Sequence, residues 1–242
     1  MNSFLRNEML LGKQVSDNIR NKCVFICGCG GVGSYAIEAV ARMGVNKIII
    51  CDMDVVDVTN INRQVIATNS TIGKSKVDLE EERIKDINPS CEVIKINNKF
   101  SSLIYKDLDE YNIDFIIDAI DTITCKWELI KYAIERNIDI ISSLGMGNRM
   151  DPTKVYITRL DKTENDPLAK KLRSMARKEK YDLKKVNVVC SKELPIKVGI
   201  VNDEGTTMKD KYPISSMMMV PATAGIYCAY YFLNKTKEEN AL

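Results

Sequence analysis

Residues 26–64 read ICGCGGVGSYAIEAVARMGVNKIIICDMDVVDVTNINRQ. An apolar run over residues 23–27 leads into a glycine-rich turn, and a helical pattern and a second apolar run, which ends at Asp52, follow it. The turn contains Gly28, Gly30, Gly31 and Gly33. This order of strand, glycine turn, helix, strand and acid is the unit that holds a nucleotide phosphate at the N-terminus of a helix. The stretch therefore predicts a nucleotide-binding α/β fold.

A polar cluster beyond the second apolar run narrows the choice of nucleotide. The cluster contains Asp52, Asp54, Asn60, Asn62, Arg63 and Gln64. A nicotinamide enzyme has no general need for a cation at this place. An enzyme that cuts ATP between its α- and β-phosphates does need one, because negative charge accumulates on those oxygens. The cluster therefore favours ATP.

The expected roles within this region follow from residue type. Asp52 stands near the spacing at which an acid meets a ribose hydroxyl, whereas Asp54 is explained equally well by a solvated or capping role. Arg63 offers a planar fork and Lys76 a mobile point charge, so both are candidate phosphate cations. Lys74 competes with Lys76 for the second role.

The composition is that of a soluble globular protein. The chain has 242 residues, with 45% apolar and 28% charged residues and a formal charge of +2, which suits one large α/β domain over residues 1–242. Its eight cysteines occur without a secretory leader, so we expect a cytoplasmic protein with reduced thiols. Paired CxxC motifs are missing, so we expect no structural zinc, and with no histidine an imidazole base is excluded.

Strands and helices alternate over the first two thirds of the chain. Expected strands cover residues 23–27, 47–51, 92–96, 115–119 and 139–143, and expected helices cover residues 34–43, 74–87 and 127–136. This alternation predicts a Rossmann-like, doubly wound, mostly parallel sheet. The C-terminal third is less regular, with expected strands over residues 155–160, 186–190 and 196–201 and a charged, helix-prone stretch over residues 166–185.

One apolar segment requires a membrane check. Residues 216–233 are almost free of charge, but the segment is marginal for a span of about 20 residues and contains Pro221 and Gly225. A buried strand-to-helix segment that packs on the sheet is the better interpretation, and we expect no transmembrane span. Peripheral membrane contact stays open.

Two carboxylates follow the expected strand over residues 115–119. Asp118 and Asp121 would lie at the carboxyl end of that strand, where ligands of open α/β sheets bind. Asp121 could hold Mg²⁺ beside the phosphates, or it could cap the helix that begins close to it.

A basic stretch lies in the C-terminal third. It contains Lys170, Lys171, Arg173, Arg177 and Lys178, with few acids between them. Composition alone slightly favours a solvated face, and contact with an RNA backbone is the alternative.

Cysteine is a possible nucleophile in an activating enzyme. Cys190 and Cys228 stand in apolar runs and are expected in the core. Cys125, at a helix start, is the better thiolate candidate.

Taken in order, these motifs resemble the adenylating superfamily of ThiF, MoeB and the ubiquitin-activating enzymes. The resemblance implies that Asp52 binds the ribose, that Asn60, Arg63 and Lys76 contact the phosphates, and that Asp121 holds Mg²⁺. It also implies that Arg6 reaches into the site of a neighbouring subunit, and hence a homodimer. The expected nucleotide-binding residues are Gly28, Gly30, Gly31, Gly33, Asp52, Asp54, Asn60, Arg63, Lys76, Asp118 and Asp121, and the expected catalytic residues are Arg63, Lys76, Asp121 and Arg6.

Within the superfamily the chain is most similar to the tRNA threonylcarbamoyladenosine dehydratases. The supporting segments are DPT from Asp151, TENDPL from Thr163, the basic stretch and VVCSKE from Val188. The resemblance implies that ATP activates the carboxylate of the threonylcarbamoyl side chain in tRNA. An internal nitrogen or oxygen then attacks and closes a ring. It makes the basic stretch a tRNA-binding element and leaves open a sulfurtransferase or sulfur-acceptor partner.

Two other functions stay open at this point. The first is an adenylyltransferase for the C-terminal glycine of a ubiquitin-like sulfur carrier, although the zinc-binding CxxC pairs of that branch are missing here. The second is a nicotinamide-dependent oxidoreductase, in which Arg63 would have no expected role in binding or catalysis.

Overall fold

The computed structural model describes residues 3–196, 200–201, 207–208 and 214–239. Within this part of the chain, seven strands form the central sheet in the order β3-β2-β1-β4-β5-β7-β6. The first six strands of that order are parallel, and β6 runs antiparallel to β7 at the edge. The strands are β1 (Cys23–Cys27), β2 (Lys47–Cys51), β3 (Glu92–Ile96), β4 (Phe115–Asp118), β5 (Asp139–Ser143), β6 (Val155–Arg159) and β7 (Val186–Ser191). The prediction of a doubly wound, mostly parallel sheet is confirmed.

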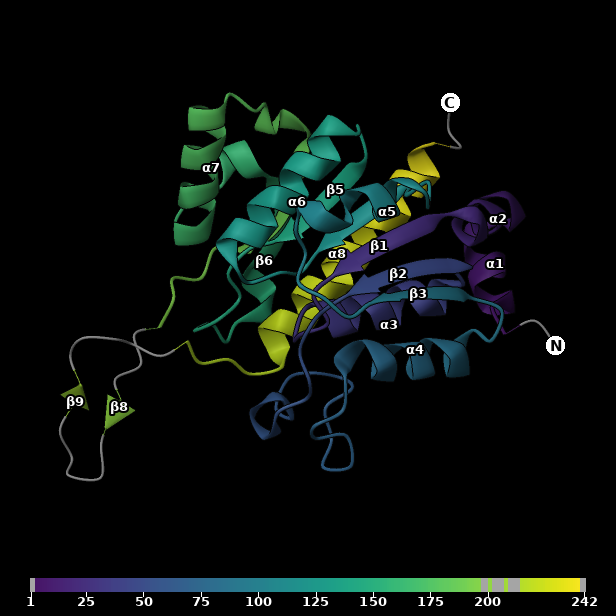
Figure 1. Ribbon diagram of the computed structural model, residues 1–242, viewed down its shortest axis with the longest axis horizontal. Helices are drawn as coiled ribbons and strands as arrows, with labels where there is room; N and C mark the ends of the chain where they lie inside the picture. Colours follow the sequence, from purple (N-terminus) through teal and green to yellow (C-terminus); the bar gives the residue numbers. More distant parts are fainter. Residues whose placement is uncertain (1–2, 197–199, 202–206, 209–213, 240–242) are drawn as a thin grey trace.

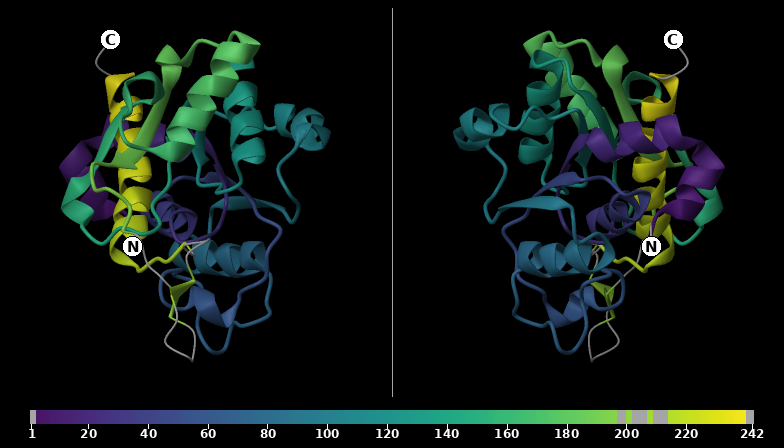
Figure 2. Two further views of the ribbon diagram at one scale, coloured as in Figure 1. Left: turned by 90° about the vertical axis from the view of Figure 1, so that its left-hand side faces the viewer. Right: turned by 90° about the vertical axis from the view of Figure 1, so that its right-hand side faces the viewer.

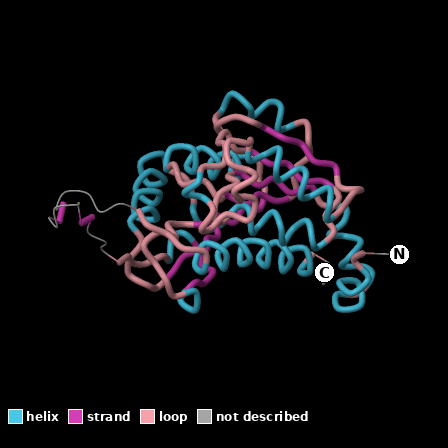
Figure 3. The backbone as a smooth tube through the Cα atoms, turned by 90° about the horizontal axis from the view of Figure 1, so that it is seen from below, coloured by secondary structure: helices cyan, strands magenta, loops and turns pink. Residues whose placement is uncertain are grey.

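Helices cover both faces of this sheet (Figures 1 and 2). One face is packed by α2 (Lys13–Asn21), α3 (Gly33–Met43), α4 (Lys76–Ile87) and α8 (Met219–Glu238). The other face is packed by α5 (Tyr105–Asp109), α6 (Ile123–Glu135) and α7 (Pro167–Glu179). A hydrophobic core lies on each face, and alternate residues of β1 pack into one or the other. Ile26 packs on the α3 face and Phe25 on the α6 face. Seen from below, the strands lie between the helices (Figure 3).

Several boundaries differ from expectation for local reasons. The predicted helix over residues 74–87 begins at Lys76, because Ser75 is extended and acts as its N-cap residue. The basic helix ends at Glu179, where Lys180 turns into the left-handed region with φ +62°. The short helix α5 was not predicted, and the antiparallel direction of β6 was not either. The predicted strand over residues 196–201 lies partly outside the described residues, which contain β8 (Ile200–Val201) paired with β9 (Thr207–Met208).

The apolar segment at residues 216–233 becomes the first part of α8, which packs against the sheet and α3. The interpretation of a buried segment is confirmed, with coil in place of a strand before Met219. Among the described residues, no helix is both long and apolar enough to cross a membrane.

The N-terminal segment forms two helices, α1 (Leu5–Leu11) and α2, separated at Gly12. Phe4 packs against Gly44, at the C-terminal end of α3. Both helices therefore lie at the end of the sheet away from the loops over residues 53–75 (Figure 1).

Candidate nucleotide and RNA site

The glycine turn lies where the strand order reverses, between β1 and β4. Gly28 has φ +96°, and a Cβ on Gly28 would stand 2.7 Å from the carbonyl oxygen of Ala119, the residue after β4. A Cβ on Gly33 would stand 1.7 Å from the carbonyl oxygen of Gly28. Only glycine fits either position. The close packing brings the N-terminus of α3 to the carboxyl edge of the sheet, where its N–H groups can receive a phosphate.

Asp52 ties this turn to the end of β2. Its carboxylate accepts a hydrogen bond from the N–H of Cys29 at 2.6 Å and one from the N–H of Asp54 at 2.8 Å. Each carboxylate oxygen has a second lone pair, so these two bonds leave room for hydroxyl donors. The position at the strand end fits the expected contact with a ribose.

The two predicted residues Asp54 and Lys76 are brought together. The ammonium of Lys76 lies 2.8 Å from the carboxylate of Asp54, and the Lys76 side chain is only 6% exposed while that of Asp54 is 59% exposed. Lys74 is exposed. The geometry thus favours Lys76 over Lys74 as the cation of the site, held by Asp54 at the start of α4.

Arg63 lies directly against the glycine turn. Its Cγ would stand 3.2 Å from a Cβ placed on Gly31. Its Nη1 donates to the carbonyl of Thr59 at 2.8 Å and to Oδ1 of Asn62 at 2.9 Å. The guanidinium is therefore supported from one side.

Asn60 is buried and shapes the loop that carries Arg63. Its Oδ1 accepts from the N–H of Asp57 at 3.1 Å, and the carboxylate of Asp57 accepts from the N–H of Thr59 at 2.8 Å. This reciprocal capping closes a short 3₁₀ turn over Val58–Asn60. The structure therefore brings the loop, the glycine turn and Lys76 to one edge.

Asp118 faces inward, away from the expected nucleotide. Its carboxylate lies 2.8 Å from the ammonium of Lys126 and accepts from the hydroxyl of Ser142 at 2.6 Å; both Asp118 and Lys126 are fully buried. The other carboxylate oxygen accepts from the N–H of Ile120 at 3.0 Å. The expectation of direct nucleotide contact does not fit this arrangement, because the buried ion pair would first have to open. Asp118 instead shapes the loop that leads to Asp121.

Lys126 was missed by the sequence reasoning, although a signal was available. It shares one face of α6 with Ile130 and Ala133, at spacings of four and seven residues, and all three are buried. A lysine on the apolar face of a helix requires a buried partner, and Asp118 at the end of a neighbouring strand provides it.

Asp121 is exposed at the carboxyl edge and accepts from the hydroxyl of Thr122 at 3.2 Å. Thr122, not Asp121, is the N-cap residue of α6, and it makes no capping bond through its side chain. Among the described residues, no three His, Cys, Asp or Glu side chains are placed to hold a metal ion together. A lone exposed carboxylate can bind a Mg²⁺ whose other ligands are phosphate oxygens and water.

The basic stretch forms α7, and its predicted tRNA-binding cations fall into two groups, one exposed and one bonded within the protein. Lys170, Lys171, Arg177 and Lys178 are exposed. Lys170 and Arg177, like Lys171 and Lys178, stand seven residues apart and therefore share a face at a distance of about 10 Å. Arg173 differs, because its Nη1 donates to the carbonyl of Thr163 at 3.0 Å and also to the hydroxyl of that residue. Arg173 therefore holds the helix in place, and the exposed face consists of the other four cations.

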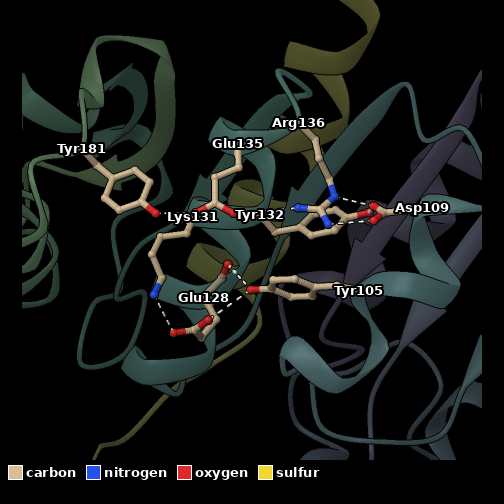
Figure 4. A network of polar contacts seen from close by, with 8 residues as sticks. All are labelled: Tyr105, Asp109, Glu128, Lys131, Tyr132, Glu135, Arg136 and Tyr181. Atoms are coloured by element: carbon tan, nitrogen blue, oxygen red, sulfur yellow. Dashed lines mark hydrogen bonds and ion pairs between the residues drawn. The ribbon is translucent and has the colours of Figure 1, made fainter.

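Helix α7 is also fastened to α6 near its C-terminal end. Trp127 donates from its indole to Glu179 at 2.9 Å, and Lys131 lies 3.4 Å from Glu179. The Tyr181 hydroxyl donates to Glu135 (Figure 4). These contacts hold the exposed cations of α7 on a rigid support.

The same network fixes α5 to α6 (Figure 4). Arg136 pairs with Asp109 at 2.7 Å and covers the ring of Tyr132, with 4.1 Å from the guanidinium carbon to the ring centre. Burial and the Asp109 contact raise the pKa of the Tyr132 phenol. The network therefore holds α5 and α6 together on their face of the sheet.

Arg6 is not part of the site of its own chain. It is exposed on α1, at the opposite end of the sheet from the glycine turn. Any contact with a nucleotide would have to be with that of another subunit, as the resemblance implies.

All eight cysteines are free and buried. The predictions for Cys190 and Cys228 are confirmed, since both lie in the core and burial raises the pKa of each thiol. Cys125 is 6% exposed and so does not stand at the surface as a thiolate nucleophile would.

Comparison with known proteins places this geometry in context. The family model described as ThiF family matches residues 4–240. The tRNA threonylcarbamoyladenosine dehydratase of Bacillus subtilis is 44% identical over 232 residues, which is 93% of this chain and 91% of that protein. The protein of the same name from Escherichia coli is 38% identical over 68% of this chain, and the match spans 61% of its own length.

Solved structures agree with the sequence relatives. The Escherichia coli tRNA N6-threonylcarbamoyladenosine dehydratase in complex with ATP has a TM-score of 0.87 and 32% identity, and the match covers 98% of this chain and 95% of that one. The same enzyme has also been solved with AMP, with the same TM-score and identity.

Proposed function

Because the chain belongs to the ThiF family, we propose that it is an ATP-dependent tRNA-modifying enzyme that cyclises threonylcarbamoyladenosine by dehydration. The observation that carries the proposal is the glycine turn at the β1–β4 reversal, with Asp52, Arg63 and Lys76 around it, in a chain 44% identical to a protein of that name. The match over residues 4–240 also supports a single ThiF-type domain over residues 1–242.

The nucleotide binds across the carboxyl edge of β1, β2 and β4. Asp52 receives the ribose hydroxyls, and the N–H groups at the start of α3 receive a phosphate. Arg63 and Lys76 face the phosphates from the loop after β2 and from the start of α4. Asn60 holds that loop closed from within, and its burial makes this supporting role its main contribution.

The chemistry is an activation followed by ring closure. A carboxylate oxygen of the threonylcarbamoyl side chain attacks a phosphorus atom of ATP, and the bond from phosphorus to its leaving phosphate oxygen breaks. An internal nitrogen or oxygen of the side chain then attacks the activated carbonyl carbon. The attacking atom gives up its proton, and the phosphate group leaves with the former carboxylate oxygen, so the nucleoside loses one water in total. Positive charge from Arg63 and Lys76 stabilises the oxygens that gain charge.

Asp121 would hold Mg²⁺ beside the phosphates, and the ion would supply positive charge there when bound. The loop from Ala119 to Asp121 is held by Asp118 and Lys126, so the carboxylate of Asp121 is presented at the edge rather than buried.

The tRNA contacts the exposed face of α7. Its four cations, Lys170, Lys171, Arg177 and Lys178, suit a phosphate backbone, and their rigid support lowers the entropic cost of binding. We assign Arg173 to the support of α7, and not to the contact surface.

The enzyme acts as a homodimer in which Arg6 completes the site of the partner. Support comes from α1, where Leu5, Met9 and Leu10 are 51%, 78% and 84% exposed beside Arg6. Apolar side chains so exposed on one helix are typical of a covered surface. We place the enzyme in the cytoplasm, and a sulfur-transferring partner is not required by the reaction.

The test is mass spectrometry of nucleosides after the protein has been incubated with Mg-ATP and tRNA that carries linear threonylcarbamoyladenosine. The product is expected to be lighter by one water, about 18 mass units, because ring closure removes the carboxylate oxygen. Arg63→Ala is expected to abolish the product. Mild recovery of the nucleosides is needed, since the cyclic form hydrolyses easily. An unchanged nucleoside from a protein that binds both ATP and tRNA would contradict the proposal and return attention to adenylation of a carrier protein, an alternative that the relatives do not favour.

A further inference from the structure

Hydrogen bonds connect Arg63 to a distant segment of the chain. Nη1 of Arg63 donates to Oδ1 of Asn62 at 2.9 Å, and Nδ2 of Asn62 donates to the backbone carbonyl of Ser216 at 2.8 Å. Both ends of the Asn62 amide are therefore used. The orientation of the guanidinium depends on where residues 214–216 lie, because Asn62 can serve both partners only in one position.

Residues 214–216 are themselves fastened to the loop that follows β5. The N–H of Asn148 donates to the carbonyl of Ser215 at 2.6 Å, and Oδ1 of Asn148 accepts from the N–H of Ser215 at 2.6 Å. The carbonyl of Asn148 accepts from the N–H of Ile196 at 2.7 Å. Asn148 has φ +58°, a left-handed conformation that asparagine adopts more readily than most residues.

The same loop reaches the start of α7. Arg149 donates from Nε to the carbonyl of Glu193 at 2.9 Å, and its guanidinium lies 3.6 Å from the carboxylate of Asp166. The Arg149 and Asp166 side chains are 2% and 1% exposed. Asp166 in turn accepts from the N–H of Ala169 at 2.9 Å and so caps α7. A buried charged pair thus joins the first turn of α7 to the residue beside Asn148.

We propose that Asn62 and Asn148 are positioning residues for Arg63, and that they make ATP binding depend on tRNA binding at α7. The inference rests on the proposed function, because it takes α7 as the surface that contacts tRNA. Bound tRNA fixes α7 and its Asp166 cap, which fixes the loop at Asn148, residues 214–216, and finally Asn62 and Arg63. By linkage, ATP then strengthens tRNA binding by the same factor as tRNA strengthens ATP binding.

The test measures the dissociation constant of Mg-α,β-methylene-ATP with and without saturating tRNA that carries linear threonylcarbamoyladenosine. In the unaltered protein, tRNA is expected to lower that constant at least about 5-fold. Asn148→Gly keeps the left-handed backbone but removes the acceptor for Ser215, so the effect of tRNA is expected to fall towards none.

Two further variants separate positioning from general damage. Asn148→Asp keeps both the acceptor and the tolerance for a positive φ, and is expected to restore the effect of tRNA. Asn62→Asp keeps the acceptor for Arg63 but replaces the donor to Ser216, and is expected to lose the effect of tRNA. This second site carries the test if Asn148→Gly proves unfolded by thermal denaturation.

Filter binding of the same tRNA distinguishes the possible failures. If tRNA binds but leaves the analogue constant unchanged in the unaltered protein, the inference is overturned and the proposed function is not. Full coupling in both Asn148→Gly and Asn62→Asp would also overturn it. If tRNA does not bind at all, the proposed function fails and the inference fails with it.

Discussion

The ammonium of Lys126 lies 2.8 Å from the carboxylate of Asp118, and neither side chain is exposed to solvent. The pair joins α6 to the carboxyl end of β4, and Ser142 at the end of β5 bonds to both members. Removing one member of a buried pair leaves the other charge uncompensated, which costs about 3–5 kcal/mol. This pair therefore controls both the stability of the fold and the shape of the loop that ends at Asp121.

Lys126→Met is accordingly expected to lower the free energy of unfolding by about 3–5 kcal/mol in urea titrations. The matched control is Lys131→Met on the same helix, whose partners Glu128 and Glu179 lie near the surface. That control is expected to cost about 1 kcal/mol or less. Equal losses in the two variants would contradict the importance given to the buried pair.

Glu80 predicts a dependence of stability on pH. It is fully buried in α4, and neither carboxylate oxygen has a hydrogen-bond partner within the part of the chain that the structure describes. Burial, with a smaller contribution from Glu38, raises its pKa well above 4.5. A raised folded pKa means that the contribution of Glu80 to stability is fully present below the unfolded value near 4.5 and is lost as the pH rises through the folded pKa.

The free energy of unfolding is therefore expected to fall as the pH rises above about 4.5, with a slope of at most about 1.4 kcal/mol per pH unit from this one group. Glu80→Gln removes the titrating proton and is expected to flatten that slope, whereas Glu82→Gln, on the exposed side of α4, leaves it unchanged. Urea titrations of the three proteins at several pH values measure it. A slope that survives Glu80→Gln would assign the titration to another group.

Gly33 and Gly30 provide a matched pair within the glycine turn. A Cβ at Gly33 would stand 1.7 Å from the carbonyl oxygen of Gly28, whereas at Gly30 its nearest neighbour is the Gln64 side chain at 3.9 Å. Gly33→Ala is expected to cost about 1–3 kcal/mol of stability, and Gly30→Ala less than about 1 kcal/mol. Thermal denaturation of both variants tests the difference, and a tolerated Gly33→Ala would show that the turn can relax.

Arg173 and Lys171 separate support from tRNA contact on α7. Lys171→Ala is expected to leave stability unchanged and to reduce the slope of log Kd against log salt by about 0.9, the amount for one phosphate contact. Arg173→Ala removes the bonds to Thr163 and is expected to lower the melting temperature while it leaves that slope unchanged. Filter binding of tRNA at four salt concentrations gives the slopes. A reduced salt slope with an unchanged melting temperature in Arg173→Ala would instead show that Arg173 contacts tRNA.

The homodimer can be tested by mixing two inactive variants. Arg6→Ala and Arg63→Ala damage different subunits of one shared site, so a mixed dimer contains one site with both arginines. Equal amounts, exchanged to equilibrium, are expected to recover about a quarter of the original activity. Mixtures that stay inactive, although native mass spectrometry finds mixed dimers, would contradict the role of Arg6.

The inner strands of the parallel sheet could be predicted closely because most of their residues are buried on both faces. Such strands appear as short apolar runs, and β1, β2 and β5 begin and end where the runs do. The edge strand β3 also has its predicted bounds, although its residues are exposed or half-buried. The direction of β6 could not be predicted, since an alternating pattern is the same for parallel and antiparallel partners. The helix α5 has five residues, too few to show a helical period.

Within the site, the residues along the glycine turn and the following loop were predictable because their types match phosphate chemistry. The inward position of Asp118 was harder to predict, since a carboxylate at a strand end suggests solvent or a ligand. Its alternation with Ile116, which packs on the α6 side, places Asp118 on that face. Glu80 could not be foreseen, because charged residues are rarely buried without a partner and nothing local marks it as an exception.

Because all eight cysteine thiols are buried, their chemical modification reports when the fold opens. Seven of them lie in the two large cores: Cys29, Cys91 and Cys228 on the α3 side of the sheet, and Cys23, Cys27, Cys51 and Cys190 on the α6 side. A thiol reagent can modify each one only when the surrounding packing has separated. A short pulse of alkylation, followed by peptide mass spectrometry, would therefore give the order in which the cores on the two faces of the sheet open. No label has to be introduced for that measurement.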